Sequence, residues 1–314
     1  MKKSLLSLLA LLMVAIIFIY FLIPAKITFS KITIINSNMS IAKRFVMNKN
    51  NWYKWFPGKV SHDTNNKTDV VYRFANLSYY IPESRTNGLA VIIKSEQDSI
   101  KSIINIIPLL KDTIAVEWKG EMPETFNPLK RLHNYMRATQ LHNNMAIILK
   151  NLQTFLINKD NVYGIHIEQK KVAETLVIST TLGSNHYPTL LTIYDLIKKL
   201  QAYISVNGGK QISYPMININ QQNNTYKTMV AIPINKKIRE TNEFSMKRMV
   251  PSNVLIAEVK GGDSTIYHAY RQMENFMNDF QRTPIMIPYE SIVIDRMKEP
   301  DTSKWITKIF FPVL

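Results

Sequence analysis

The C-terminal half of the chain repeats one order of elements: strand, helix, strand, strand. The first copy has a strand-like run, a helix and two more runs at 174–181, 187–204, 214–219 and 226–233, and the second has their counterparts at 253–259, 264–280, 288–294 and 305–312. Val177 and Ile256 lie about 79 residues apart, as do Pro233 and Pro312, and such a fixed period marks an internal repeat. We therefore expect two βαββ units, at about 172–235 and 250–314, that share one sheet. A groove between their helices would favour small-molecule binding.

Length and composition predict more than one folded domain. A chain of 314 residues with 46% hydrophobic residues can bury two cores, and the polar segment 158–161 is the predicted linker. We expect domains at 26–158 and 159–314, so that the whole chain belongs to the α+β class. The chain has no cysteine, which excludes disulfides, thiol nucleophiles and cysteine-based zinc sites.

The chain is strongly basic, with a formal net charge of +16. A basic balance is compatible with a nucleic-acid partner or an anionic membrane surface. Basic pairs such as Lys170–Lys171 and Lys236–Lys237 are scattered, however, and no helix-turn-helix or zinc-finger pattern accompanies them. We therefore expect no nucleic-acid partner, and composition alone can account for the charge.

An apolar run at the N-terminus predicts a membrane anchor at 1–25. Lys2 and Lys3 precede an uncharged stretch from Leu5 to Ile23, which is followed by Pro24. As a helix this stretch would be about 28 Å long, close to the thickness of a bilayer's hydrocarbon core. A cleaved signal peptide is the alternative, but the bulky Ile23 does not suit a small-x-small cleavage site. We expect a single pass with the N-terminus inside and the body outside the cytoplasm, although Lys26 and Lys31 nearly balance the basic residues across the segment.

The second predicted domain resembles the effector-binding domain of AraC-type and gyrase-inhibitor-like proteins. The resemblance covers about 150 residues and rests on the repeat, on Gly262 to Tyr267 at the entry to the second helix, and on two strand motifs. The motifs are Pro288-Tyr289-Glu290 and the closing pattern of Trp305, Thr307, Ile309 and Pro312. It implies a pseudo-twofold cup for hydrophobic, often cationic, small molecules. The family usually has an acidic residue after the threonine, where this chain has Lys308, which argues against a purely cation-selective pocket.

The first predicted domain resembles START-like (SRPBCC), polyketide-cyclase-type helix-grip domains. The resemblance rests on an opening strand at 27–35, a short helix, the aromatic turn Trp52-x-x-Trp55-x-Pro57 and a long final helix. Fusion of such a domain to an N-terminal anchor and an effector-binding domain is a known arrangement. Trp52 and Trp55 could line the mouth of a cavity or fill the core.

Five residues of the second domain are predicted to line the ligand cup. Glu290 lies in an apolar strand and shares a face with Ile292, where an unpaired carboxylate is costly unless a ligand meets it. Trp305 could present its indole face to a cation or belong to the core. Tyr267 and Tyr270 open the second helix, and Tyr267 is the better pocket candidate because Tyr270 falls in the helix's apolar stripe. The alternative for Glu290 is a solvated position at a strand end.

These features predict a membrane-anchored sensor or carrier of hydrophobic small molecules that is not an enzyme. The six histidines show no metal-ligand spacing, and no nucleophile elbow or phosphate loop is present, so we expect no metal and no cofactor. The alternative is a small-molecule hydrolase or a cyclase-like enzyme in which Glu290 is the general base. Ligand identity, oligomeric state and any regulated partner are left open.

Overall fold

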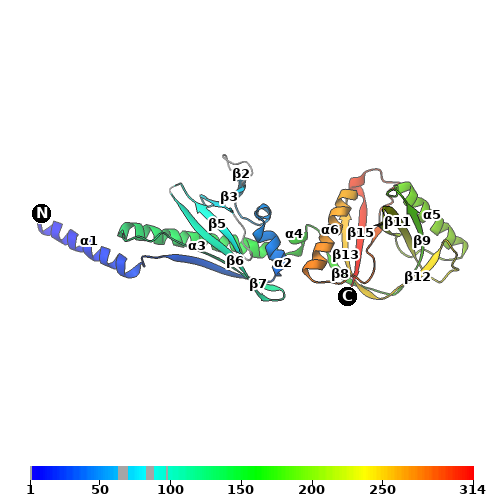
Figure 1. Cartoon of the computed structure of the whole chain (residues 1–314), viewed down its shortest axis with the longest axis horizontal. Coiled ribbons are helices and arrows are strands. Elements are labelled where there is room, and N and C mark those ends of the chain that lie inside the picture. The colour runs from blue at the N-terminus through cyan, green and yellow to red at the C-terminus, as the bar shows by residue number, and fades with distance from the viewer. Residues whose placement is uncertain (1, 63–69, 83–87, 97) are drawn as a thin grey trace. The chain divides into compact units, whose positions relative to one another are not determined.

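The computed structural model describes residues 2–62, 70–82, 88–96 and 98–314 (Figure 1). The chain forms two compact units, Met1–Asn158 and Lys159–Leu314. Both units combine helices with antiparallel strands, so the fold is of the mixed α and β type.

In the part that the structure describes, the first unit has a seven-stranded antiparallel sheet and two long helices, α1 and α3. Its elements are α1 (Lys2–Leu22), β1 (Thr28–Ile35), α2 (Met39–Ala42), η1 (Lys43–Met47), η2 (Lys49–Lys54), β2 (Lys59–His62), β3 (Val70–Phe74), β4 (Leu77–Tyr80), β5 (Gly88–Lys94), β6 (Ser99–Leu110), β7 (Thr113–Glu121) and α3 (Pro128–Ile157). The sheet order is β1-β7-β6-β5-β4-β3-β2, in which the first strand pairs with the last.

Helix α3 has the start signals and the apolar face of a sheet-packing helix. The side chain of Asn127 accepts hydrogen bonds from the N–H groups of Leu129 and Lys130, and Pro128 occupies the first turn. The helix buries one apolar stripe, and its members are Met145, Ile148, Leu149, Leu152, Phe155 and Leu156. From the same helix, the amide of Gln153 donates to the carbonyl of Ile34 on β1 at 2.8 Å.

The three tryptophans of the first unit belong to its core. Trp52, Trp55 and Trp118 are all at least 96% buried. Their indole N–H groups donate to the carbonyls of Val46 and Phe45 and to the hydroxyl of Ser102, respectively. Buried indoles with satisfied donors are structural, so of the two alternatives for this aromatic turn the structure favours core over cavity lining.

Helix α1 exposes apolar side chains and is held at its C-terminal end by α3. Leu11 and Phe21 are 71% and 90% exposed. The guanidinium of Arg131 on α3 lies 4.5 Å from the ring of Tyr20 and donates to the carbonyl of Ile23 at 3.1 Å. Among the described residues, no helix combines the length and hydropathy that a membrane span requires. The predicted anchor thus stays a prediction.

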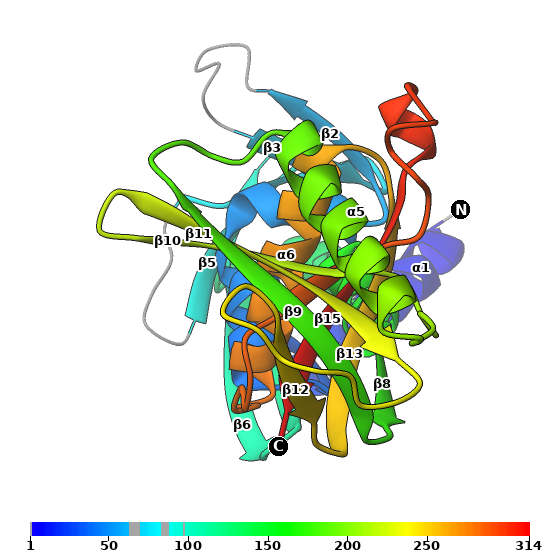
Figure 2. The same cartoon turned by 90° about the vertical axis from the view of Figure 1, so that its right-hand side faces the viewer.

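The second unit is an eight-stranded antiparallel sheet with two main helices. Its elements are α4 (Lys159–Tyr163), β8 (Glu168–Val172), β9 (Thr175–Ser184), α5 (Leu190–Val206), β10 (Met216–Gln222), β11 (Thr225–Ile234), β12 (Ser245–Met249), β13 (Ser252–Lys260), α6 (Asp263–Asp279), β14 (Tyr289–Ile292), η3 (Thr302–Lys304) and β15 (Ile306–Val313). The sheet order is β12-β9-β11-β10-β14-β15-β13-β8. The sheet is curled (Figures 1 and 2). Helix α5 packs on β9 and β11, and α6 packs on β13 and β15.

The sheet order has the pseudo-twofold symmetry that the sequence repeat predicts. Strands β9, β11 and β10 mirror β13, β15 and β14, and the two halves join where β10 pairs with β14. The strand register corrects one detail of the repeat. Pro233 pairs with Val177, whereas its counterpart Pro312 pairs with Val254. The structural equivalent of Val177 is therefore Val254 and not Ile256, because the segments between the first and last strands differ in length.

Candidate functional site

Glu290 lies at the junction of the two halves, on the sheet face that the helices cover. Its cross-strand partners are Ile217 on β10 and Ile309 on β15. Directly paired residues point to the same face, and Ile217 belongs to the apolar core beneath α5. The Glu290 side chain is 20% exposed. The sheet thus holds a largely buried carboxylate between two apolar side chains.

Arg296 is the nearest cation to this carboxylate. Its Nη2 lies 3.5 Å from Oε2 of Glu290 and donates to the hydroxyl of Thr307 at 2.8 Å. The backbone N–H of Arg296 donates to the hydroxyl of Tyr194 on α5 at 2.7 Å, which fixes the loop after β14 to the first half. The side chain is 7% exposed, and its Nε has no hydrogen-bond partner among the described residues. A buried donor without a partner is costly, and a water molecule or ligand would relieve that cost.

The protonation of Glu290 reflects opposing influences. Burial raises the pKa of this carboxyl above its ordinary value, and the nearby carboxylate of Asp263 on α6 raises it further. The Arg296 guanidinium lowers the pKa and opposes both effects. A charged ligand bound beside Glu290 would therefore shift the pKa of this carboxyl further.

Two tyrosines, one from each half, lie near the Glu290 charge. Burial and the negative charge of Glu290 raise the pKa of Tyr270 on α6, and the same two causes raise the pKa of Tyr187, which precedes α5. The ring of Tyr270 lies 5.6 Å from that of Phe311, and the ring of Tyr187 lies 5.6 Å from that of Tyr226. Both tyrosines stay protonated at neutral pH, so they offer hydroxyl donors and aromatic faces.

The five predicted cup residues occupy different kinds of position. Glu290 and Tyr270 influence each other electrostatically. Trp305 lies next to the same group, because the guanidinium of Arg296, which pairs with Glu290, lies 4.9 Å from its indole ring. The Trp305 N–H donates to the carbonyl of Glu299 at 2.8 Å. Tyr267, the better pocket candidate in the sequence, is 66% exposed. Ile292 is buried in the core that packs under α5.

Lys308 does not belong to this cluster. It pairs with Glu258 on β13, and its Nζ lies 3.3 Å from Oε2 of that residue. Its neighbours Thr307 and Ile309 are fully buried on the helix face, so Lys308 points to the opposite face. The sequence-based argument that Lys308 limits cation selectivity is therefore wrong, because Lys308 does not face Glu290. Arg296 is the cation that faces Glu290, and no periodic pattern in the loop after β14 could have indicated it.

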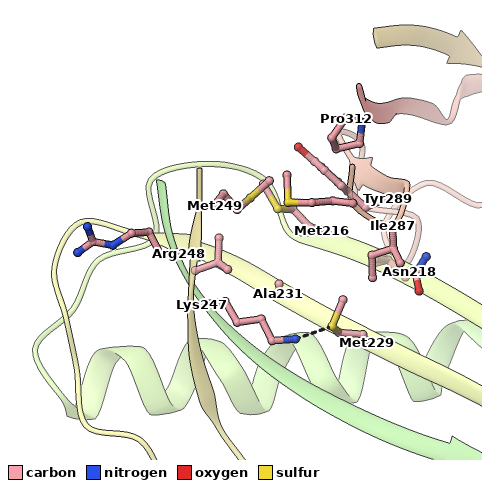
Figure 3. Close-up of a pocket in the computed structure, with 13 residues that line it drawn as sticks. Met216, Asn218, Met229, Ala231, Lys247, Arg248, Met249, Ile287, Tyr289 and Pro312 are labelled. Carbon is pink, nitrogen blue, oxygen red and sulfur yellow. Dashed lines mark hydrogen bonds between the residues drawn. The ribbon is translucent and has the colours of Figure 1, made fainter. Parts of the chain in front are cut away.

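The sheet face that the helices leave uncovered carries a pocket that the sequence did not indicate. The methionine pocket has a volume of about 290 Å³, and its lining includes Met216, Met229, Met249, Met286, Tyr289 and Lys247. Figure 3 shows these strands with α5 behind them and the labelled pocket side chains in front. No group of three or more histidine, aspartate or glutamate side chains suited to a metal ion occurs in the described part of the chain.

No protein-family profile matches this chain, and no curated protein matches it. Among solved structures it is similar to the C-terminal domain of EcmrR, with 17% identity over 48% of this chain and 98% of that one and a TM-score of 0.41. It is also similar to a hydrolase from Listeria innocua (10% identity, 47% and 91% coverage, TM-score 0.37) and to SAV2435 bound to tetraphenylphosphonium (12% identity, 48% and 94% coverage, TM-score 0.31). At these values, function has to be inferred from the chain's own residues.

Proposed function

We propose that the second unit binds hydrophobic small molecules, cationic ones included, beside Glu290 between α5 and α6, as a sensor or carrier. The observation that supports this most is a carboxylate, 20% exposed, on an apolar sheet face, whose charge acts on a tyrosine of each half. A buried carboxylate is costly, and a ligand cation would offset that cost. Aromatic faces attract cations by about 0.5–2 kcal/mol each.

Arg296 competes with a cationic ligand for the Glu290 carboxylate. Because its guanidinium lies 3.5 Å from Glu290, a cationic ligand has to share the carboxylate with it or displace it. Asp263 adds a second negative charge near Glu290, which favours a cation over an anion. A neutral hydrophobic ligand does not compete with Arg296 for the carboxylate. We therefore expect the site to bind both cationic and neutral hydrophobic molecules, with a modest preference for the cations.

The test compares a hydrophobic cation with a neutral molecule of similar shape. Tetraphenylphosphonium and triphenylphosphine oxide would be titrated into the full chain and into Glu290→Gln by calorimetry. We expect Glu290→Gln to weaken the cation at least tenfold and the neutral compound by less than threefold, since close charge pairs at interfaces couple by about 1.5–7 kcal/mol. The matched control is Glu258→Gln, which removes the same charge on the opposite face. Equal effects of the two variants would reject the role of Glu290.

One observation also favours an enzyme, in the form of a small-molecule hydrolase or cyclase. The raised pKa of Glu290 suits a general base, because such a base works best when its pKa approaches the working pH. In that case Glu290→Gln would abolish turnover and retain binding. Loss of binding with no turnover in either protein would favour the sensor or carrier.

We also propose that α1 anchors the chain and that the first unit is a START-like helix-grip domain. Support comes from the long α3 over a curled antiparallel sheet and from apolar side chains exposed where α1 meets α3, among them Phe126 and Leu129. Deleting residues 1–25 should release the protein from membranes in alkaline extraction. Because the chain lacks cysteine, Tyr53→Cys supplies a unique label site. Labelling from outside intact cells would support a body outside the cytoplasm.

A further inference from the structure

We infer that the methionine pocket is a second ligand site, which takes an amphiphile with an apolar body and one anionic head group. This goes beyond the proposed function, because the pocket and Glu290 lie on opposite faces of one sheet. Successive strand residues point to opposite faces, and β14 places Tyr289 in the pocket and Glu290 among the helices. On β10 the Ile217 side chain belongs to the core under α5, although this residue also contributes to the pocket lining beside Met216.

The shape and lining of the pocket suit a flexible apolar ligand. Its volume of about 290 Å³ lies near the lower end of the range for small-molecule sites. Four of the lining side chains are methionines, whose unbranched thioethers adapt to different shapes and are common at versatile binding surfaces. Of the residues labelled in Figure 3, Ile287, Tyr289 and Pro312 come from the second half and the others from the first, so the pocket spans the junction.

One wall of the pocket is a buried, stacked aromatic side chain. Tyr289 is 8% exposed, and its ring stacks on that of Phe310 with centroids 4.8 Å apart and an interplanar angle of 7°. Burial raises the pKa of Tyr289 to about 12, so the side chain is neutral at physiological pH. The methionines can therefore adjust against a fixed aromatic surface.

The charge of the pocket is positive. Lys247 and Arg248 on β12 are its charged lining residues, and the lining contains no carboxylate. Arg248 is paired with Glu174 at 2.9 Å and points away from the methionines in Figure 3. Lys247 instead reaches across the pocket, and its Nζ contacts Sδ of Met229 at 3.2 Å.

The Lys247 contact indicates where the anionic head group would bind. A thioether sulfur is a weak acceptor for an ammonium group. Within the described part of the chain, no carboxylate forms an ion pair with Lys247. A ligand carboxylate at this position would gain a charge-assisted hydrogen bond while its tail lies along the methionines. The expected ligand is therefore a medium-chain carboxylate, opposite in charge to the ligand expected at Glu290.

The test uses three probes with the same ten-carbon tail: decanoate, 1-decanol and decyltrimethylammonium. The full chain, labelled with methyl-13C methionine and held in lipid nanodiscs, would be titrated with each probe and followed by methyl NMR. We expect saturable shifts at the four pocket methionines with decanoate, and at least tenfold weaker binding of the other two probes. Lys247→Gln should weaken decanoate at least tenfold, whereas Lys198→Gln, an equal charge change on the exposed side of α5, should leave it unchanged.

Two further variants make the outcome decisive. Ala231→Leu adds volume inside the pocket and should abolish the decanoate shifts, and if it fails to fold, the Lys247 pair decides alone. Glu290→Gln should leave decanoate binding intact, so this inference and the proposed function can fail separately. Equal shifts with all three probes, or shifts indifferent to Lys247→Gln, would overturn the inference.

Discussion

Ile217 and Glu290 are direct partners in the pairing of β10 with β14, and they also hold equivalent places in the two repeats. Ile217 pairs with Val230 in its own half as Glu290 pairs with Ile309. The second half thus carries a carboxylate where the first carries an isoleucine. Of this equivalent pair only the second-half member is acidic, so the apolar frame is nearly symmetric while its charge is not.

Cation affinity should depend on pH through Glu290. Because burial raises the pKa of this carboxyl above 4.5, the folded protein retains the proton at pH values where the unfolded chain has lost it. The free energy of unfolding should therefore fall as pH rises from about 4.5 through the raised pKa. Tetraphenylphosphonium affinity should rise over the same interval, since the carboxylate forms there. Calorimetry between about pH 4 and pH 8 would measure this rise, and Glu290→Gln should flatten it.

Reversing the charge of Lys308 should barely affect the Glu290 site. Lys308→Glu faces Glu258 on the opposite side of the sheet, so it replaces an ion pair with a repulsive pair. We expect less than a twofold change in tetraphenylphosphonium affinity and a loss of stability below about 1 kcal/mol, as is usual for exposed pairs. A large gain in cation affinity would show that Lys308 acts on the site after all.

Removing Arg296 should destabilise the second unit. Arg296→Met leaves the Glu290 carboxylate without its nearest cation and the Thr307 hydroxyl without its donor. We expect a loss of about 1–3 kcal/mol at neutral pH, and less at acidic pH where Glu290 is protonated. Fluorine NMR of 5-fluorotryptophan can follow unfolding, because Trp305 is the one tryptophan after residue 158. Adding Glu290→Gln should recover part of the loss, and an additive double variant would contradict the coupling.

Trp52 should be essential to the stability of the first unit. The side chain is fully buried, and its ring centroid lies 4.6 Å from that of Trp55 and 6.4 Å from that of Trp118. Trp52→Ala should cost about 3–5 kcal/mol, measured by thermal unfolding with Trp118 as the reporter. The neighbouring Tyr53→Ala, at a side chain that is 59% exposed, should stay within about 0.5 kcal/mol. A small effect of Trp52→Ala would reinstate the cavity-lining alternative.

The repeated helices and central strands could be predicted because they follow apolar periodicity. The apolar periodicity predicts a helix at 187–204, and α5 spans Leu190–Val206. It begins later because the Thr189 hydroxyl caps it by accepting from the N–H of Thr192. Helix α6 was expected at 264–280 and spans Asp263–Asp279. Local patterns suffice for such elements, since each buries one face regardless of its distant partners.

Two strands and one site residue could not be predicted in this way. Strands β8 and β12 are the two edge strands of the sheet. Their sequences, Glu-Gln-Lys-Lys-Val and Ser-Met-Lys-Arg-Met, lack the alternation of a half-buried strand. Charged edges are common because they discourage pairing with other chains. Arg296 lies in an irregular loop, and only the fold brings it to Glu290.

The junction of the two halves is short, and this has a mechanical consequence. Two residue pairs join β10 to β14, compared with seven between β10 and β11 and four between β14 and β15. Bending about this junction would disturb few main-chain hydrogen bonds besides the contact of the Arg296 N–H with Tyr194. We therefore expect the junction to bend more readily than either half. Because the Glu290 site and the methionine pocket lie on opposite faces of the sheet at this junction, bending that widens one site should narrow the other. We expect antagonism that is equal in both directions: saturating tetraphenylphosphonium should weaken decanoate, and decanoate should weaken tetraphenylphosphonium by the same factor.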